Sequence, residues 1–178
     1  MSVRSIVRRS ASVGLAALAL VLGPAISPAQ AYTYDEQTVV IKNVNSGLCL
    51  EVADWRTDWG APVRQWQCTG GANQKWVKVV DTADGKAIQR YYRNVNSGAC
   101  LEIAGANSNW NGAIADQWQC NGGNNQAFQI TQGGFMPVMS ATLMCLEIAD
   151  WSMDWGAPAR LWECTNRPNQ QWRQEPVG

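Results

Sequence analysis

Residues 49–76 read CLEVADWRTDWGAPVRQWQCTGGANQKW. The same pattern returns as CLEIAGANSNWNGAIADQWQCNGGNNQAF over residues 100–128 and as CLEIADWSMDWGAPARLWECTNRPNQQW over residues 145–172. Each copy begins with Cys-Leu-Glu, contains Trp-x-Cys about twenty residues later, and ends with Asn-Gln-x-aromatic. A unit of roughly fifty residues that occurs three times in tandem indicates a repeat architecture.

All six cysteines lie inside the copies, two in each. Equivalent units should close equivalent loops, and a loop of about twenty residues would stabilise the fold by roughly 3 kcal/mol on the chain-entropy estimate. The alternative is a zinc site, which would need ligand pairs such as Cys-x-x-Cys that the sequence lacks. We therefore expect no metal, and the repeat predicts the disulfides Cys49–Cys68, Cys100–Cys120 and Cys145–Cys164.

The first 31 residues have the pattern of a secretory signal peptide. Three arginines open this segment, an apolar run covers residues 11–22, and Ala29-Gln30-Ala31 is a small-x-small cleavage site. The apolar run is short for a membrane-spanning helix, although a retained membrane anchor is the alternative. We expect cleavage before Tyr32 and a secreted, extracellular domain over residues 32–178, in a compartment where disulfides persist.

The charge and composition of the mature chain exclude several classes of function. Of the 14 basic residues, 3 lie in the N-terminal segment, which leaves 11 against 14 acidic residues. A mildly acidic chain lacks the basic stripe that phosphate binding requires, so we expect no nucleic-acid partner. The sequence contains no histidine, which excludes imidazole metal ligands and Ser-His or Cys-His catalytic pairs. We expect no cofactor.

Short strand-like runs separated by turn residues fill each copy. In the first copy they cover residues 38–42, 48–52, 61–67 and 76–80, and the turn-forming dipeptide Asp84-Gly85 follows. The other copies keep this order, which predicts about twelve short strands in repeats over about 38–84, 85–133 and 134–175. No segment after the first 31 residues has a convincing helical period.

The repeated apolar positions predict the core. No copy is large enough to bury its own apolar face, but three copies around a pseudo-threefold axis can do so. Each copy contributes two aliphatic residues at equivalent positions and the aromatic residue that ends the copy. The expected core residues are therefore Leu50, Val52, Trp76, Leu101, Ile103, Phe128, Leu146, Ile148 and Trp172. The chain is therefore expected to be one all-β domain.

Cys-Leu-acid, Trp-x-Cys and Gln-x-Trp in three tandem copies resemble the ricin-B-type lectin domain, a β-trefoil. The resemblance covers about residues 38–175. Gln74-Lys75-Trp76 and Gln170-Gln171-Trp172 match the family signature, while Gln126-Ala127-Phe128 has phenylalanine in place of tryptophan. The resemblance implies a β-trefoil that binds galactose- or xylose-type sugars, with up to one shallow pocket per copy and no catalysis.

The family's sugar site combines an acid after the first cysteine, an aromatic platform before the second, and the Asn-Gln pair before the closing tryptophan. A pyranose has an apolar face that stacks on an indole and hydroxyl groups that need fixed donors and acceptors. The resemblance implies carbohydrate-binding residues Glu51, Trp66, Asn73 and Gln74 in the first copy and Glu147, Trp162, Asn169 and Gln170 in the third. The second copy has Glu102, Trp118, Asn125 and Gln126 at these positions.

Two departures from the family pattern affect these sites. All three copies carry glutamate where the family usually has aspartate, which moves the carboxylate by about 1.5 Å, half the length of a hydrogen bond. The residue two positions before the platform is arginine in the first and third copies and Asp116 in the second. Arg64 and Arg160 can pair with the nearby glutamates, whereas Glu102 faces a like charge. We therefore expect sugar sites in the first and third copies and none in the second.

Four loop tryptophans, in the motif D-W-x-x-D-W-G, suggest a possible additional binding loop in the first and third copies. Large aromatic residues are not required for packing in a loop, so exposed ones usually bind a ligand. The alternative is that they cap one end of the barrel. These residues are Trp55, Trp59, Trp151 and Trp155.

The sequence thus predicts a secreted, monomeric, carbohydrate-binding module that is not an enzyme. The alternative function is that of a β-trefoil interaction or inhibitor protein that binds a partner protein through the tryptophan loops. A glycoside hydrolase would need two carboxyl groups about 5–10 Å apart, whereas Glu51, Glu102 and Glu147 are threefold equivalents. Paired loop aspartates such as Asp54 and Asp58 could suit calcium, but no recognised calcium-loop motif is present.

Overall fold

The computed structural model describes residues 33–83, 86–105, 109–131, 134–137 and 143–177, so the expected signal peptide lies outside the described residues. Twelve β-strands and four three-residue 3-10 helices form within this part of the chain. No helix in it is long and apolar enough to cross a membrane. The strands are β1 (Thr33–Asn43), β2 (Cys49–Val52), β3 (Ala61–Trp66), β4 (Lys75–Ala83), β5 (Lys86–Asn94), β6 (Cys100–Ile103), β7 (Ala115–Trp118), β8 (Phe128–Thr131), β9 (Gly134–Pro137), β10 (Met144–Ile148), β11 (Ala159–Glu163) and β12 (Trp172–Pro176).

Six of these strands form the barrel. β1 pairs with β12 and with β4, β4 pairs with β5, β5 with β8, and β8 with β9, always antiparallel. A bridge between Gly134 of β9 and Gln171, the residue before β12, closes the ring. A closed sheet leaves no exposed edge for unwanted pairing with other chains.

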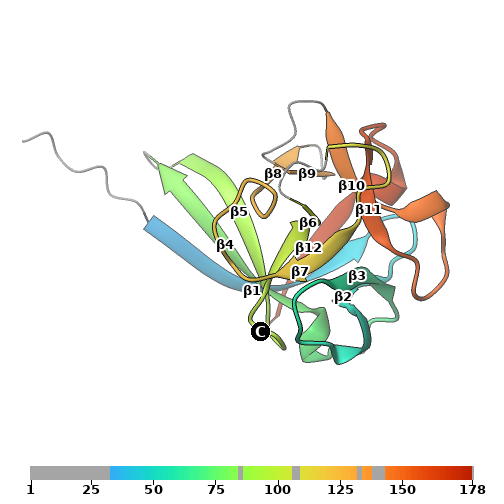
Figure 1. Cartoon of the computed structure of the whole chain (residues 1–178), viewed down its shortest axis with the longest axis horizontal. Coiled ribbons are helices and arrows are strands. Elements are labelled where there is room, and N and C mark those ends of the chain that lie inside the picture. Colours follow the sequence, from blue (N-terminus) through green and yellow to red (C-terminus); the bar gives the residue numbers. More distant parts are fainter. Residues whose placement is uncertain (1–32, 84–85, 106–108, 132–133, 138–142, 178) are drawn as a thin grey trace, which may run out of the picture.

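The other six strands form one antiparallel hairpin per copy: β2–β3, β6–β7 and β10–β11. The hairpins contact one another, because β3 also pairs with β7 and single bridges join Arg64 to Pro158 and Ile114 to Arg160. Figure 1 shows the long strands β1, β4 and β5 on one side of the molecule and the hairpins β2–β3 and β10–β11 on the other. The expected all-β trefoil of twelve strands is confirmed.

The predicted core is buried. All six equivalent aliphatic residues are 0% exposed, as are Trp76 and Phe128, and Trp172 is 5% exposed. The indole Nε1 of Trp76 donates a hydrogen bond of 3.0 Å to the carbonyl of Leu50, and Trp172 makes the same bond to Leu146. Phe128 has no such donor, so the second copy holds its hairpin without this bond.

The three predicted disulfides are present. Cys49 bonds to Cys68, Cys100 to Cys120 and Cys145 to Cys164, with Cα–Cα distances of 5.1, 5.0 and 5.0 Å. Each one fixes the turn after the second hairpin strand to the first strand of the same hairpin. All six cysteines lie in the described residues, and none is free. Each copy therefore presents a hairpin and a fixed turn on the same side.

Candidate functional site

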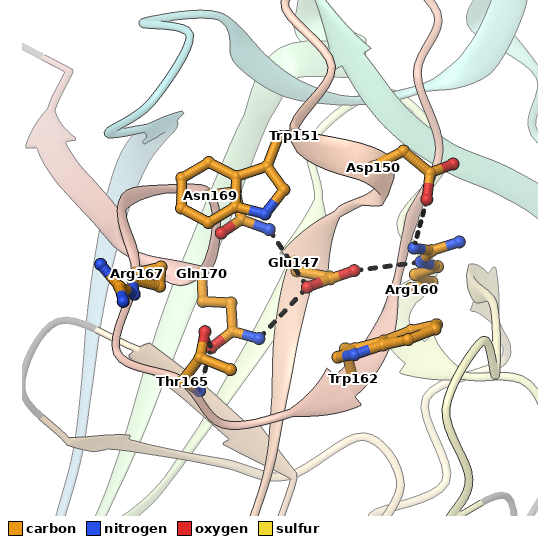
Figure 2. A pocket seen from close by; sticks show the side chains of 9 residues that line it. All are labelled: Glu147, Asp150, Trp151, Arg160, Trp162, Thr165, Arg167, Asn169 and Gln170. Carbon is orange, nitrogen blue, oxygen red and sulfur yellow. Dashed lines mark hydrogen bonds and ion pairs between the residues drawn. The ribbon is translucent and has the colours of Figure 1, made fainter.

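Two pockets open at equivalent places in the first and third copies, between the hairpin and the turn that follows it. The pocket of the first copy has a volume of about 190 Å³ and that of the third copy about 340 Å³. The first pocket is lined by Glu51, Asp54, Trp55, Arg64, Trp66, Thr69 and Asn73. Figure 2 shows the larger one, lined by Glu147, Asp150, Trp151, Arg160, Trp162, Thr165, Arg167, Asn169 and Gln170.

The glutamate at the floor of the third-copy pocket is held by three donors. Glu147 is 4% exposed. Its Oε1 accepts a hydrogen bond of 3.1 Å from Nε of Arg160, and its Oε2 accepts from Nδ2 of Asn169 and Nε2 of Gln170, both also at 3.1 Å. This carboxylate therefore organises the floor of the pocket, and few of its lone pairs remain for a ligand.

Glu51 occupies the same position in the first copy and is 3% exposed. It accepts from Nε of Arg64 at 3.1 Å, from Nδ2 of Asn73 at 3.2 Å and from Nε2 of Gln74 at 3.0 Å. The expected ion pairs between the glutamates and the arginines are thus confirmed. The sequence-predicted acid and amide residues come together in both copies, but as one internal network.

The arginine of each pocket connects the floor to the aromatic platform. The guanidinium carbon of Arg64 lies 4.5 Å from the centre of the Trp66 ring, and that of Arg160 lies 4.4 Å from the Trp162 ring. Figure 2 shows Arg160 on the side of the Trp162 ring that faces Glu147. The face of the platform that a sugar would use is therefore partly covered by a stacked cation.

A strained loop supplies a second tryptophan to each pocket. Asp54 and Trp55 have φ angles of 54° and 57°, and Asp150 and Trp151 have 53° and 57°. The left-handed region costs such residues roughly 1–2 kcal/mol each. Ion pairs of 2.8 Å from Arg64 to Asp54 and from Arg160 to Asp150 help to hold the loops. The strain places Trp55 and Trp151 on the pocket wall with 55% and 48% of their surface exposed.

The second tryptophan of each loop has a different environment. Trp155 of the third copy lies 5.6 Å from Trp66 of the first copy, measured between ring centres, and Trp59 of the first lies 5.7 Å from Trp118 of the second. The four loop tryptophans are 48% to 56% exposed, which is too much for residues that seal a barrel. The sequence grouped these four residues together, whereas the structure separates pocket walls from contacts between copies.

Two buried glutamines hold these loops from the neighbouring copy, a role that sequence reasoning missed. Nε2 of Gln65 donates to the carbonyls of Ser152 and Asp154, both at 2.9 Å. Nε2 of Gln117 does the same for the first-copy loop, with bonds of 3.2 and 3.0 Å to Arg56 and Asp58. The only sequence signal is a glutamine at a position that faces the core in a strand.

One amide oxygen beneath each pocket lacks a hydrogen-bond partner in the described part of the chain. Oδ1 of Asn73 and Oδ1 of Asn169 are buried and have no hydrogen-bond partner among the described residues. Thr69 and Thr165 also line the pockets, each with its backbone N–H bound to the glutamine of the Asn-Gln pair. Arg167 adds a cation to the third-copy pocket where the first copy has glycine.

The second copy has an equivalent hairpin with a different charge at the position of the arginine. Glu102 on β6 faces Asp116 on β7 in the register of the hairpin, as expected. Burial raises the pKa of the Asp116 carboxyl to about 7, and the charge of Glu102 raises it in the same direction. Burial also raises the pKa of Glu102, while hydrogen bonds from Gln126 and Asn125 oppose that change. Two buried carboxyl groups thus share a position that holds an ion pair in the other copies.

Sequence comparisons place these features in a known group. A model described as a ricin-type β-trefoil lectin domain matches residues 89–178, and one described as ricin-type β-trefoil lectin domain-like matches residues 28–92. Serine protease 1 of Rarobacter faecitabidus is 47% identical over 34 residues, a match that spans 19% of this chain and only 6% of that protease.

Solved structures agree with the sequence comparisons. The designed threefold-symmetric protein ThreeFoil has a TM-score of 0.70 and 28% identity, covering 79% of this chain and 99% of its own. The exo-β-1,3-galactanase 1,3Gal43A of Clostridium thermocellum has the same score and identity, over 80% of this chain and 31% of its own length. The galactanase therefore contains, within a longer chain, a region that resembles this protein.

Proposed function

Because the chain belongs to the ricin-type β-trefoil lectin family, we propose that it is a secreted carbohydrate-binding module that binds saccharides in the pockets of the first and third copies. The observation that carries this proposal is the pair of equivalent pockets, each with an exposed tryptophan on a strained loop. Strained backbone persists where surrounding contacts maintain it, and it concentrates at binding sites. Two copies maintain the same strain with the same ion pair.

In this proposal the apolar face of a sugar ring stacks on Trp55 or Trp151. The platform residues Trp66 and Trp162 carry the arginine, whose outward N–H groups donate to the sugar hydroxyls. The threonine hydroxyl completes the rim as an acceptor, because its proton is donated to the glutamine of the Asn-Gln pair. Glu51 and Glu147, with Gln74 and Gln170, act as positioning residues that fix the arginine and the asparagine.

The size of the pockets supports a short saccharide at each site. Drug-sized ligands occupy pockets of roughly 300–1,000 Å³. The third-copy pocket, about 340 Å³, lies just above the lower limit, and the first-copy pocket, about 190 Å³, lies below it. Weak binding at each site is therefore expected, with avidity when one polysaccharide reaches both. Since 1,3Gal43A is an exo-β-1,3-galactanase, galactan-type sugars are the first class to test.

Secretion, a single domain over residues 32–178, a monomeric state and the lack of catalysis belong to the same proposal. Three disulfides suit an oxidising compartment, and the N-terminal pattern suits export. Glu51 and Glu147 support binding without catalysis, because each is buried and accepts hydrogen bonds from three donors of its own copy.

A glycan array with the oxidised protein tests the proposal, followed by calorimetric titration of the best ligand. Trp151→Ala should weaken binding to the third copy about tenfold, since a stacking contact contributes roughly 1–1.5 kcal/mol. Trp110→Ala is a matched control, because Trp110 is an equally exposed loop tryptophan that lines neither of these pockets. Equal losses in both variants, with folding intact, would refute the assigned pocket.

A second function is favoured by one observation. Trp59 and Trp155 are 56% and 55% exposed, lie against tryptophans of neighbouring copies, and line neither sugar pocket. Paired exposed aromatics are typical of protein interfaces. If no glycan binds, a β-trefoil that binds a partner protein through these pairs becomes the better proposal, and Trp59→Ala and Trp155→Ala are the variants that test it.

A further inference from the structure

The three copies provide an internal comparison of one structural position. In the first copy a cation lies between a buried carboxylate and an indole face: Nε of Arg64 is 3.1 Å from Oε1 of Glu51, and its guanidinium carbon is 4.5 Å from the Trp66 ring centre. The third copy repeats this arrangement with distances of 3.1 and 4.4 Å. The hairpin of this fold therefore forms a place for a cation, and its own arginine occupies that place twice.

The second copy keeps the acid and the indole but lacks the cation. Glu102 and Trp118 take the positions of Glu51 and Trp66, and Asp116 replaces the arginine. No ion pair to either carboxylate is present in the described part of the chain. The position thus holds a second carboxyl group where its equivalents hold a cation.

The acidic pair is incompletely satisfied. Asp116 is 6% exposed, and its Oδ1 is buried with no hydrogen-bond partner among the described residues. Glu102, which is 5% exposed, accepts a bond of 2.8 Å from Gln126 on Oε2. Residue Pro62 of β3 lies opposite Asp116 and brings no charge. A buried acceptor without a donor destabilises the site until a donor reaches it.

The indole of the second copy is also more accessible than its equivalents. Trp118 is 39% exposed. Over the described residues, stacked guanidinium groups are found on Trp66 and Trp162 but not on Trp118. Trp59 approaches it at 5.7 Å with a tilt of 41° and so does not stack flat against it. One face of the ring remains available for the apolar side of a sugar and for an attached cation.

We propose that the second copy binds a protonated amino sugar, whose ammonium group lies between Glu102, Asp116 and the ring of Trp118, as the arginine does in the other copies. The N–H donors of an ammonium match Oδ1 of Asp116, which has no partner among the described residues, and the acceptor capacity that Glu102 keeps beside its bond from Gln126. The pyranose ring stacks on the indole. A metal ion is less well matched, because the described residues contain no group of three or more His, Cys, Asp or Glu side chains that could hold one. This inference revises the expectation that the second copy has no site.

The inference depends on the proposed function only in taking a saccharide as the ligand, and the two can fail separately. The probe is a glucosamine tetramer, with the fully N-acetylated tetramer as its uncharged control. Binding is measured by calorimetry near pH 7 in low salt, together with titration of the indole N–H signals by NMR. The glucosamine tetramer should shift the signal of Trp118 and bind at least tenfold more tightly than the acetylated one.

Asp116→Arg is the decisive variant, because it installs the side chain that the first and third copies hold at this position. It should fold, retain binding of neutral glycans to the other copies, and weaken binding of the glucosamine tetramer 10- to 100-fold. Trp118→Ala should weaken it about tenfold. Asp116→Asn, which keeps the size and removes the charge, should fall between the parent and Asp116→Arg.

Several results would overturn the inference. One is equal affinity for the charged and acetylated tetramers, and another is undiminished glucosamine binding by a folded Asp116→Arg. Shifts of Trp118 caused by calcium or by lysine-rich peptides, with none from glucosamine, would assign the position to a metal or a protein instead. If glucosamine binds through Trp118 while no neutral glycan binds the other copies, the inference stands and the proposed function fails.

Discussion

Replacement of the buried glutamate of the third copy tests the most specific energetic claim about the pockets. Glu147 accepts three hydrogen bonds, and each donor residue has one other partner that remains after Glu147→Ala. Arg160 keeps its bond to Asp150, Asn169 its bond to the carbonyl of Ile148, and Gln170 its bond to the carbonyl of Glu163. A hydrogen bond to a charged group contributes about 1.5–3 kcal/mol, but the three bonds share one acceptor and are not additive. The expected loss in the free energy of unfolding is about 2–4 kcal/mol.

Glu147→Gln separates a structural role from direct ligand binding. Its amide can satisfy one neighbouring donor but places its own N–H₂ group beside Arg160 or the pocket amides, so we expect a loss of about 1–2 kcal/mol. Urea denaturation with the disulfides intact measures both variants, and Glu51→Gln in the first copy is the matched replicate. Unchanged stability in Glu147→Gln, together with lost glycan binding, would show that the carboxylate is a free ligand and refute the reasoning.

Three further predictions concern stability. Because the pKa of Asp116 is raised on folding, the folded state binds a proton more tightly than the unfolded state. The free energy of unfolding should therefore be higher at pH 4 and fall as the pH rises through about 7. The full effect is at most about 4 kcal/mol, and denaturation curves of Asp116→Asn should lose most of that pH dependence. Trp76→Phe, which installs the phenylalanine that the second copy has at this position, should destabilise the fold by about 1–2 kcal/mol in the same assay. The loss comes from the hydrogen bond to Leu50 and from the packing contacts of the larger indole. Unchanged stability would argue against that bond. Gln65→Leu, which installs the residue that the third copy has at this position, removes two hydrogen bonds to the third-copy loop. It should lower the free energy of unfolding by about 1–2 kcal/mol and weaken glycan binding at Trp151. Hydrogen exchange of that loop measures the effect, and undiminished protection would contradict the role of Gln65.

The repeat explains how much of the structure was predictable. Cysteine pairs, the core leucines and the closing aromatics occur at equivalent positions three times, so one interpretation had to suit all three copies. The position of each residue in its hairpin indicated that Glu51 faces Arg64 and that Glu102 faces Asp116. The strand register confirms both pairs. The predicted disulfides, core positions and facing residues of the hairpins are therefore confirmed.

Contacts between copies were not predictable in the same way. The sequence does not show that Gln65 reaches the loop of the third copy or that Trp155 lies against Trp66, since these residues are about ninety positions apart. Nor does spacing reveal that Arg160 stacks on Trp162 and covers the expected sugar platform. Side-chain conformation and packing across the pseudo-threefold axis decide these contacts, and neither has a local sequence pattern.

The central claim is that sugars bind in the pockets of the first and third copies, and one NMR titration tests it most directly. The ten tryptophans give ten indole N–H signals, which report on both pockets, the contacts between copies and the core. A neutral glycan selected by the array should shift the signals of Trp55 and Trp151, with smaller shifts of Trp66 and Trp162, and leave the buried Trp76 and Trp172 unchanged. Saturable shifts confined to Trp59, Trp118 and Trp110, or no shift with any glycan, would contradict the account.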